Sequence, residues 1–335
     1  MILLLTVVLA GTATAQDTVE VSNAQEIQNV TEVLDGDYVL TDDIDLSDTE
    51  FEPIGDIRTP FTGSFDGNGH TVSGLTVEPS GNRFPQDFAG LFGVIGTNGT
   101  VRELGIEDSR VVGGQDVGGI TGVNNGEIRR SYFDGEISGN TAVGGLVGLN
   151  YGELSRSYAT VRVEATGNDV GGIVGSNIGN MTETYAAGTV MSDGTGIGGA
   201  VGTGPGNTSR VYWDTELSGI SGSEDSAGTG LTTDEMTGGT ARDNMDLDFD
   251  GTWRTTQVYP ALVWQSDDAV VEVPDDGTGD GDVNDDTSDD GDGDTDGTDE
   301  DNADDTSDDT EGMPGFGTLV ALTALSVGVF LRRRR

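Results

Sequence analysis

The sequence predicts an all-β repeat solenoid, with a right-handed parallel β-helix as the expected form. Four units of 26 or 27 residues follow one another, beginning at Val117, Val143, Val170 and Ile197, and a divergent fifth precedes them from Phe88. Glycine provides 55 of the 335 residues, more than twice its average share of about 7%, which indicates many tight turns. A unit this short cannot bury an apolar face alone, whereas stacked units bury a continuous core.

Aligned on their first residues, the units keep one residue type at each position. Two apolar positions and one tyrosine position form the predicted structural core of the repeat: Ile120, Leu146, Ile173, Ile128, Leu154, Met181, Tyr132, Tyr158, Tyr185 and Tyr212. Between them, Asn124, Asn150 and Asn177 are expected to form a side-chain ladder from coil to coil. The recurring glycines are expected at corners with positive φ. Short β-rich runs separated by Asn and Gly are typical of strands and turns.

The pattern decays towards the last unit, as the end of a capped solenoid requires. We therefore expect an N-terminal capping segment (16–53), a solenoid (54–223) and a C-terminal capping segment (224–273). The units of the solenoid are 88–116, 117–142, 143–169, 170–196 and 197–223. Ser22 and Gln25 have the spacing of a capping box, so a short helix is expected to close the N-terminal end.

Charge restricts the class of protein. Sixty acidic residues face fifteen arginines, with no lysine, for a formal net charge of −45. Such a body repels itself in dilute buffer, and molar salt screens that repulsion, so we expect a halophilic protein; an ordinary acidic secreted protein is the alternative. No basic patch exists to neutralise phosphates, which excludes nucleic acid as a partner. The absence of cysteine excludes disulfides and zinc-thiolate sites.

The N-terminal end and the acidic segment near the C-terminus are expected to lie outside the fold. Residues 1–15 combine an apolar core with an Ala-x-Ala site, as in a secretory signal peptide, although no basic residue precedes that core. Residues 274–313 are rich in Asp, Gly and Thr and predict a disordered acidic stalk. Its Asp-x-Asp runs resemble part of a calcium-binding loop, but Ala303 stands where a bidentate Glu is needed, so a solvated spacer is favoured over calcium.

Residues 314–335 join an apolar run to four terminal arginines, and the run is shorter than the roughly 20 residues of a membrane span. The segment closely resembles the PGF-type sorting signal of archaeal surface proteins, with Pro314, Gly315 and Phe316 as its motif. The resemblance implies cleavage by an archaeosortase-type enzyme and a lipid anchor in the membrane, with a retained peptide anchor as the alternative.

The repeats themselves also resemble a known family. "GGLVG" and "GGIVG", each followed by a Gly-x-Ile/Leu-x-x-Ser-Tyr type of sequence, resemble the GLUG repeat of large microbial surface proteins. The resemblance runs from residue 36 to residue 265 and includes a lead-in (51–77) and a tail (230–239 and 250–264). It implies a β-helical fold and no defined activity. With the sorting signal and the acidic composition, it implies a haloarchaeal cell surface.

No motif predicts catalysis. "GGLVG" is not a phosphate loop, because such a loop needs a lysine. His70, near Asp66 in sequence, is expected to pack on its turn rather than to act as a base. Stacked Glu127 and Glu153 would have the roughly 5 Å separation of a retaining glycosidase, but solvated surface is the favoured interpretation, ahead of a weak cation site.

Two further features concern the surface. In the expected register, Glu183 lies between Arg156 and Arg210 on neighbouring coils, as a structural ion-pair column. Four sequons are candidate N-glycosylation sites, at Asn29, Asn98, Asn180 and Asn207.

The predicted function is non-enzymatic, without metal or cofactor: adhesion, or association with cell-envelope or surface glycans. A polysaccharide lyase or hydrolase and a purely structural spacer are the alternatives. Clustered acids with an arginine in a groove would favour a lyase, a row of exposed aromatics would favour glycan binding, and a uniform Asp/Thr face would favour a spacer.

Overall fold

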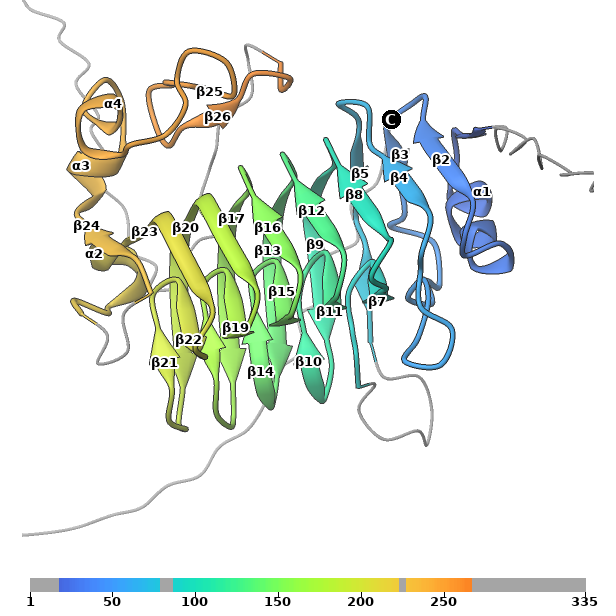
Figure 1. Ribbon diagram of the computed structural model, residues 1–335, viewed down its shortest axis with the longest axis horizontal. Helices are drawn as coiled ribbons and strands as arrows, with labels where there is room; N and C mark the ends of the chain where they lie inside the picture. The colour runs from blue at the N-terminus through green and yellow to red at the C-terminus, as the bar shows by residue number, and fades with distance from the viewer. Residues whose placement is uncertain (1–17, 79–86, 223–226, 267–335) are drawn as a thin grey trace, which may run out of the picture. The chain divides into compact units, whose positions relative to one another are not determined.

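The structure, a computed structural model, describes residues 18–78, 87–222 and 227–266. All of them belong to one compact unit of the chain, Met1–Asp280. Apart from the last two, their strands stack in parallel, coil upon coil, as a β-solenoid (Figure 1). The predicted all-β solenoid is therefore confirmed.

Fifteen strands form the largest sheet, which covers two sides of the coil. Its first side follows the order β1 (Val19–Val21), β2 (Asp37–Leu40), β4 (Ser64–Asp66), β8 (Thr100–Arg102), β12 (Glu127–Arg129), β16 (Glu153–Ser155) and β20 (Asn180–Ser192). The long β20 continues into the second side, with β17 (Tyr158–Ala165), β13 (Tyr132–Gly139), β9 (Gly105–Val112), β5 (Thr71–Ser73) and β3 (Ile44–Asp45). Attached to this path are β6 (Thr76–Val77), β23 (Asn207–Asp214) and β24 (Thr229–Leu231).

Two smaller sheets complete each coil. One contains β7 (Phe92–Ile95), β11 (Thr121–Asn124), β15 (Val147–Asn150), β19 (Val174–Asn177) and β22 (Val201–Thr203). The other contains β10 (Gln115–Val117), β14 (Thr141–Gly144), β18 (Val170–Gly171) and β21 (Ile197–Gly198). Register partners are the residues that the repeat alignment pairs, for example Ile128 with Leu154 and Leu154 with Met181. These side chains, with Ile120, Leu146 and Ile173, are buried in the interior of the coil.

The asparagine ladder is confirmed. Asn124 Nδ2 donates to Asn150 Oδ1, and Asn150 Nδ2 donates to Asn177 Oδ1, both at 2.8 Å. All three side chains are buried. A buried amide without a hydrogen-bond partner costs stability. In the ladder, the asparagine of one coil provides a partner for the asparagine of the next coil.

The expectation that the repeat glycines supply positive φ is wrong. The bend between the two sides of the large sheet is made instead by Arg130, Arg156, Glu183 and Arg210, with φ of 49°, 52°, 54° and 56°. The glycines allow close approach of coils: a Cβ on Gly145 would lie 2.2 Å from the carbonyl oxygen of Gly172.

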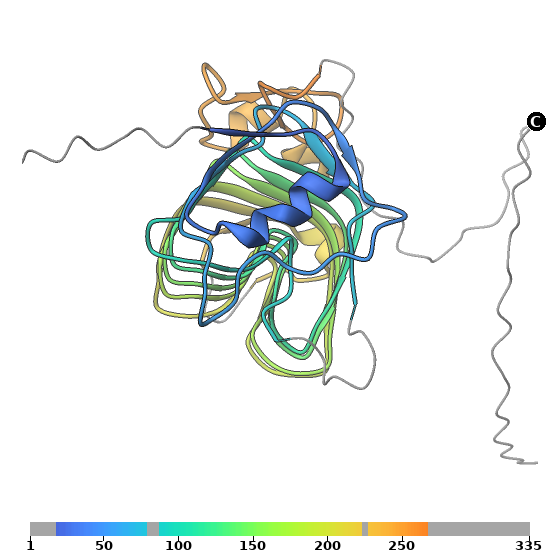
Figure 2. The same ribbon diagram turned by 90° about the vertical axis from the view of Figure 1, so that its right-hand side faces the viewer.

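A helix closes the N-terminal end of the coil, as expected (Figure 2). It is α1 (Ala24–Asn29), continued by the 3₁₀ turn η1 (Val30–Glu32), and it buries Ile27 and Val30 against the solenoid core. Its N-cap is Asn23 rather than Ser22, because the Asn23 side chain accepts from two N–H groups of the first turn. Strands β1, β2 and β3 lie within 16–53, so the sheet begins well before the expected solenoid boundary at residue 54.

At the other end, Trp213 and the turn α2 (Thr215–Ser218) cover the last coil. The chain continues through α3 (Thr233–Met236) and α4 (Ala241–Asn244) to the antiparallel pair β25 (Trp253–Arg254) and β26 (Ala261–Leu262). This segment does more than cap the end, because it returns along the outside of the coil (Figures 1 and 2). The helices in the described ranges are all too short to cross a membrane.

Candidate functional site

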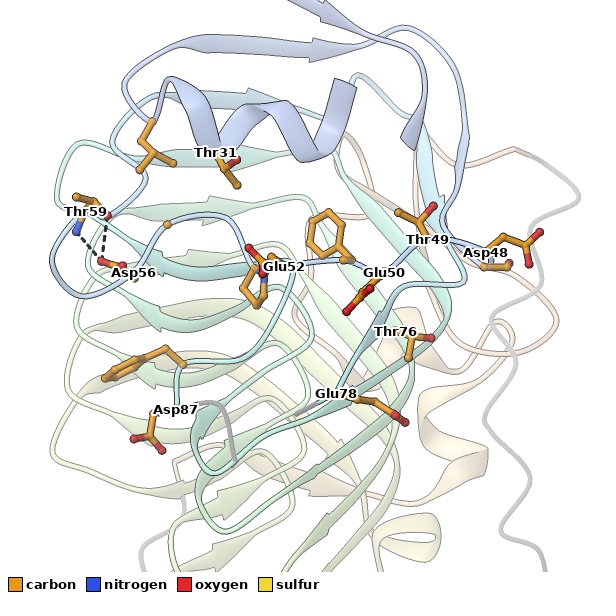
Figure 3. A pocket seen from close by; sticks show the side chains of 16 residues that line it. Thr31, Asp48, Thr49, Glu50, Glu52, Asp56, Thr59, Thr76, Glu78 and Asp87 are labelled. Atoms are coloured by element: carbon orange, nitrogen blue, oxygen red, sulfur yellow. Dashed lines mark hydrogen bonds between the residues drawn. The ribbon is translucent and has the colours of Figure 1, made fainter. Parts of the chain in front are cut away.

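Six carboxylates face an open cleft of about 780 Å³ near the N-terminal end of the solenoid (Figure 3). Four come from the loop between β3 and β4, one directly follows β6, and one lies five residues ahead of β7: Asp48, Glu50, Glu52, Asp56, Glu78 and Asp87. Hydrogen bonds from the N–H groups of Thr59 and Arg58 lower the pKa of the Asp56 carboxyl. The cleft therefore carries negative charge at neutral pH.

This cleft has neither the geometry of a metal site nor that of a lyase. Within the described part of the chain, no three His, Cys, Asp or Glu side chains come close enough together to hold a metal ion. The described residues that line the cleft include no arginine, and Arg110 beside it is paired with the lining carboxylate of Glu78 at 3.5 Å. The cleft attracts cations diffusely and repels anions.

Tyrosines form a stacked column on the outside of the coil wall. The rings of Tyr132, Tyr158 and Tyr185 lie parallel on successive coils, with centroids 4.9 and 5.0 Å apart. They belong to a second apolar cluster rather than to the solenoid core, where the tyrosines were expected. The reason is strand alternation: the next residue of each strand, such as Phe133, is the one that faces the interior.

Residues 253–265, which we call the strap, cover this column. Trp253 packs on Tyr185 at 5.5 Å, and Trp264 stacks on Tyr132 at 5.6 Å between ring centroids. Gly105, the register partner of Tyr132 on the preceding coil, leaves room for the Tyr132 ring, because a Cβ there would lie 2.6 Å from it. The row of aromatics that would indicate a glycan platform is therefore buried.

Polar contacts fasten the strap. Trp264 Nε1 donates to the Arg130 carbonyl at 3.0 Å, and Gln265 Nε2 donates to the Tyr158 hydroxyl at 2.8 Å. The Tyr259 hydroxyl donates to the buried carboxylate of Asp214 at 2.6 Å. Burial raises the pKa of the Tyr158 hydroxyl well above its usual range, so it stays protonated and is no catalytic base.

Asp134 is the most perturbed carboxyl beside the column. Burial raises the pKa of the Asp134 carboxyl to about 6, and the negative charges of Asp108 and Glu107 also raise it. A hydrogen bond of 2.6 Å from the Thr160 hydroxyl lowers the pKa but does not outweigh burial. A pKa near neutrality is found in acid–base catalysts, but structural burial has the same effect. Here the carboxyl pairs with the neighbouring strand, and we assign it a structural role.

The first side of the large sheet presents a polar face to solvent. One outward column contains Thr100, Glu127, Glu153, Asn180 and Asn207, and the next contains Arg102, Arg129, Ser155, Thr182 and Ser209. The bend adds a third column of Glu103, Arg130, Arg156, Glu183 and Arg210. We call these three columns the corner face.

The glutamates of the corner face do not form an isolated acid pair. Glu127 and Glu153 are register partners as expected. Glu127 Oε1, however, lies 3.0 Å from Arg129 Nε, and Glu153 is exposed on a flat strand. This arrangement favours the solvated-surface interpretation over a glycosidase pair, because no substrate cleft separates the two carboxylates.

The ion-pair column at the bend is confirmed. Glu183 Oε2 lies 3.2 Å from Arg156 Nε, and Glu183 Oε1 lies 2.7 Å from Arg210 Nη2. The side chain of Glu183 is only 5% exposed, whereas those of Arg156 and Arg210 are 43% and 40% exposed. One buried carboxylate therefore holds two half-exposed guanidinium groups on the surface.

His70 contacts Asp43 rather than Asp66. Its Nδ1 lies 3.2 Å from Asp43 Oδ1, which also accepts from the Thr71 N–H at 2.9 Å. The shared carboxylate ties the turn to the preceding coil, which is a structural arrangement.

The four sequon asparagines are all exposed. Asn29 ends α1, Asn98 lies in the turn between β7 and β8, and Asn180 and Asn207 lie on the corner face, where Asn207 Nδ2 donates to Asn180 Oδ1 at 2.9 Å. The expected signal peptide (1–15), the acidic stalk with its calcium alternative (274–313), and the sorting motif Pro314, Gly315 and Phe316 lie outside the described residues.

Comparison with known proteins agrees with the repeat. A profile of the GLUG motif matches residues 139–164. The chain carries a GLUG motif. Halomucin of Haloquadratum walsbyi is 36% identical over 140 residues, which cover 37% of this chain and 2% of halomucin. A protein of Evansella cellulosilytica named as a Gly-rich membrane protein is 41% identical over 95 residues, covering 28% of this chain and 10% of that protein. The chain thus spans a small fraction of the length of these relatives.

A solved structure shares the fold. It is a crystal structure from Bacteroides ovatus whose title describes an immunoglobulin A1 protease, and it superposes with a TM-score of 0.60 at 19% sequence identity. The match covers 76% of this chain and 94% of the other. At this identity, the similarity shows the β-solenoid and carries no activity across.

Proposed function

We propose that the protein is a non-enzymatic cell-surface protein that associates with cell-envelope or surface glycans through the outer wall of its solenoid. The observation that carries the proposal is the corner face, where polar side chains repeat in register over successive coils. Parallel strands place these side chains about 4.8 Å apart on a rigid wall. Such a wall offers repeated contacts to an extended polymer.

Surface display is part of the same proposal. The similarity to halomucin and to a protein named for a membrane location supports it. We propose that residues 1–15 direct secretion, and that residues 314–335 anchor the chain after processing by an archaeosortase-type enzyme, with residues 274–313 as the spacer between anchor and solenoid.

A glycan array tests the proposal. The full chain is applied at molar salt to neutral and acidic polysaccharides, and bound protein and released products are both measured. Retention without product formation is expected. Release of shorter sugars would contradict the proposal and favour a polysaccharide-active enzyme, and a complete lack of retention would favour a structural spacer.

A further inference from the structure

The corner face differs in charge from the rest of the protein. Residues 16–274 contain 41 acids and 11 arginines, a net of −30. The three columns of the corner face contain five of those arginines and four glutamates, a net of +1. The corner face is therefore close to neutral, so it repels a polyanion less than the acidic body as a whole does.

Two arginines, Arg156 and Arg210, lie on the last three coils of the face, where the acids are Glu183 and the exposed Glu153. Arg156 and Arg210 share the single carboxylate of Glu183, so the trio carries one net positive charge. Because Glu183 is buried beneath them, the groups that solvent meets are the two guanidinium ions. Each guanidinium has five N–H donors in a planar fork, and the ion pair engages Nε of Arg156 and Nη2 of Arg210.

Uncharged hydrogen-bonding groups on β20 and β23 accompany the two arginines, with Glu153 on the preceding coil. Thr182 and Ser209 are register partners on β20 and β23, as are Asn180 and Asn207. Thr182 is half-buried, and the other three are exposed. Together with Arg156 and Arg210, these four residues form a donor-rich surface, which we call the arginine patch.

We propose that the arginine patch binds an acidic polysaccharide through its carboxylate or sulfate groups. The inference rests on the proposed glycan association and specifies the ligand class. Charge-assisted hydrogen bonds from Arg156 and Arg210 hold one anionic group, and the Thr182, Ser209 and asparagine side chains contact the neighbouring hydroxyls. Molar salt reduces the Debye length to about 3 Å, which removes long-range attraction and leaves such contact pairs.

Titration of the full chain at molar salt tests the inference. The probes are polygalacturonate for carboxylate, dextran sulfate for sulfate and dextran as the neutral polymer. Arg210→Gln removes one guanidinium while Arg156 still pairs with Glu183, and it should weaken binding of an acidic probe about tenfold, the value for one charge-assisted hydrogen bond. Arg110→Gln is the matched control, because Arg110 is also half-exposed and ion-paired, with Glu136, but lies on β9, outside the patch.

A second variant keeps every charge. Thr182→Val preserves the shape of the side chain and should weaken binding about threefold, as expected for one neutral hydrogen bond. Melting temperatures of all variants confirm that the fold is intact. Equal weakening by Arg210→Gln and Arg110→Gln would overturn the inference, since it would show a response to net charge alone.

The remaining outcomes separate this inference from the proposed function. Dextran binding that Arg210→Gln does not alter would leave glycan association standing and overturn the patch as an acidic-polymer site. No binding of any probe would contradict both. Displacement of a bound probe by a synthetic peptide of residues 275–311 would assign the patch to the chain's own acidic segment and overturn the assignment to a polysaccharide.

Discussion

Replacing Trp253 by alanine should release the strap and leave the coil folded. Trp253, the first residue of the strap, is completely buried against the tyrosine column, with its ring centroid 5.5 Å from that of Tyr185 and 6.1 Å from that of Tyr158. A buried tryptophan removes roughly 150–250 Å² from water, and at about 25 cal/mol per Å² this corresponds to about 4–6 kcal/mol. We therefore expect Trp253→Ala to cost about 4 kcal/mol, within the range for such truncations.

Hydrogen exchange measured by mass spectrometry distinguishes local release from global unfolding. The strap and the solenoid core are separate apolar clusters, so amides in residues 253–265 should lose about a thousandfold of protection while β13 and β17 keep theirs. Val263→Ala is the control, because Val263 lies in the strap and is 50% exposed. It should change protection by less than about threefold. Equal loss of protection in the strap and in β17 would refute the separation of the two clusters.

Three further predictions concern the coil. Gly145→Ala should destabilise the fold by about 3 kcal/mol or more, because the nearest obstacle to a Cβ is backbone, whereas Gly239→Ala, with open space around it, should be neutral or slightly stabilising in urea unfolding. Glu183→Gln should lower the free energy of unfolding by about 2 kcal/mol. This is less than the loss expected on breaking a fully buried ion pair, because both arginines are half-exposed. An unchanged urea midpoint would show that the bend does not need the carboxylate. Burial raises the pKa of Asp134 to about 6 in the folded state, above the unfolded value of about 3.9. Its contribution to the free energy of unfolding is therefore fully present below a pH of about 4 and is lost as the pH rises through 6. Asp134→Asn should therefore raise the melting temperature at pH 7 and have little effect at pH 4, and a lower melting temperature at pH 7 would contradict this sign.

The sequence predicts the coil well because aligning the repeat units shows which residues of neighbouring coils are register partners. Once Leu154 aligns with Ile128 and Met181, the pairing of three strands follows, and with it the asparagine ladder and the place of Glu183. The backbone at the bend was not predictable in this way. Positive φ is usually expected at glycine, but here residues such as Arg156 adopt it.

The strap could not be predicted from the repeat, because it contacts coils far from it in sequence. Trp264 meets Tyr132 and Arg130 across more than a hundred residues. Two signals were available in the sequence. A tyrosine recurs at one position of each of the four units from residue 117 onward, and the coil before them has Gly105 at the matching position. Strand alternation alone does not decide whether a tyrosine column faces the interior or a covering segment, since both environments are apolar.

The strap contacts the column at the bend to which Arg156 and Arg210 of the arginine patch also belong, which allows a test of how the patch is held. Trp264 bonds to the carbonyl of Arg130, so strap release changes the environment of the column that also contains Arg156 and Arg210. Those two side chains, however, are oriented by Glu183 and by strands β20 and β23, all of which belong to the coil. Trp253→Ala should therefore keep the affinity for an acidic polysaccharide within about threefold of the wild type, whereas Glu183→Gln should change it. The sign for Glu183→Gln is positive: losing the shared carboxylate leaves both guanidinium groups without their intramolecular anion, so the folded variant should bind the polyanion more tightly. If Trp253→Ala abolished binding instead, the ligand would be held by the strap and not by the arginines.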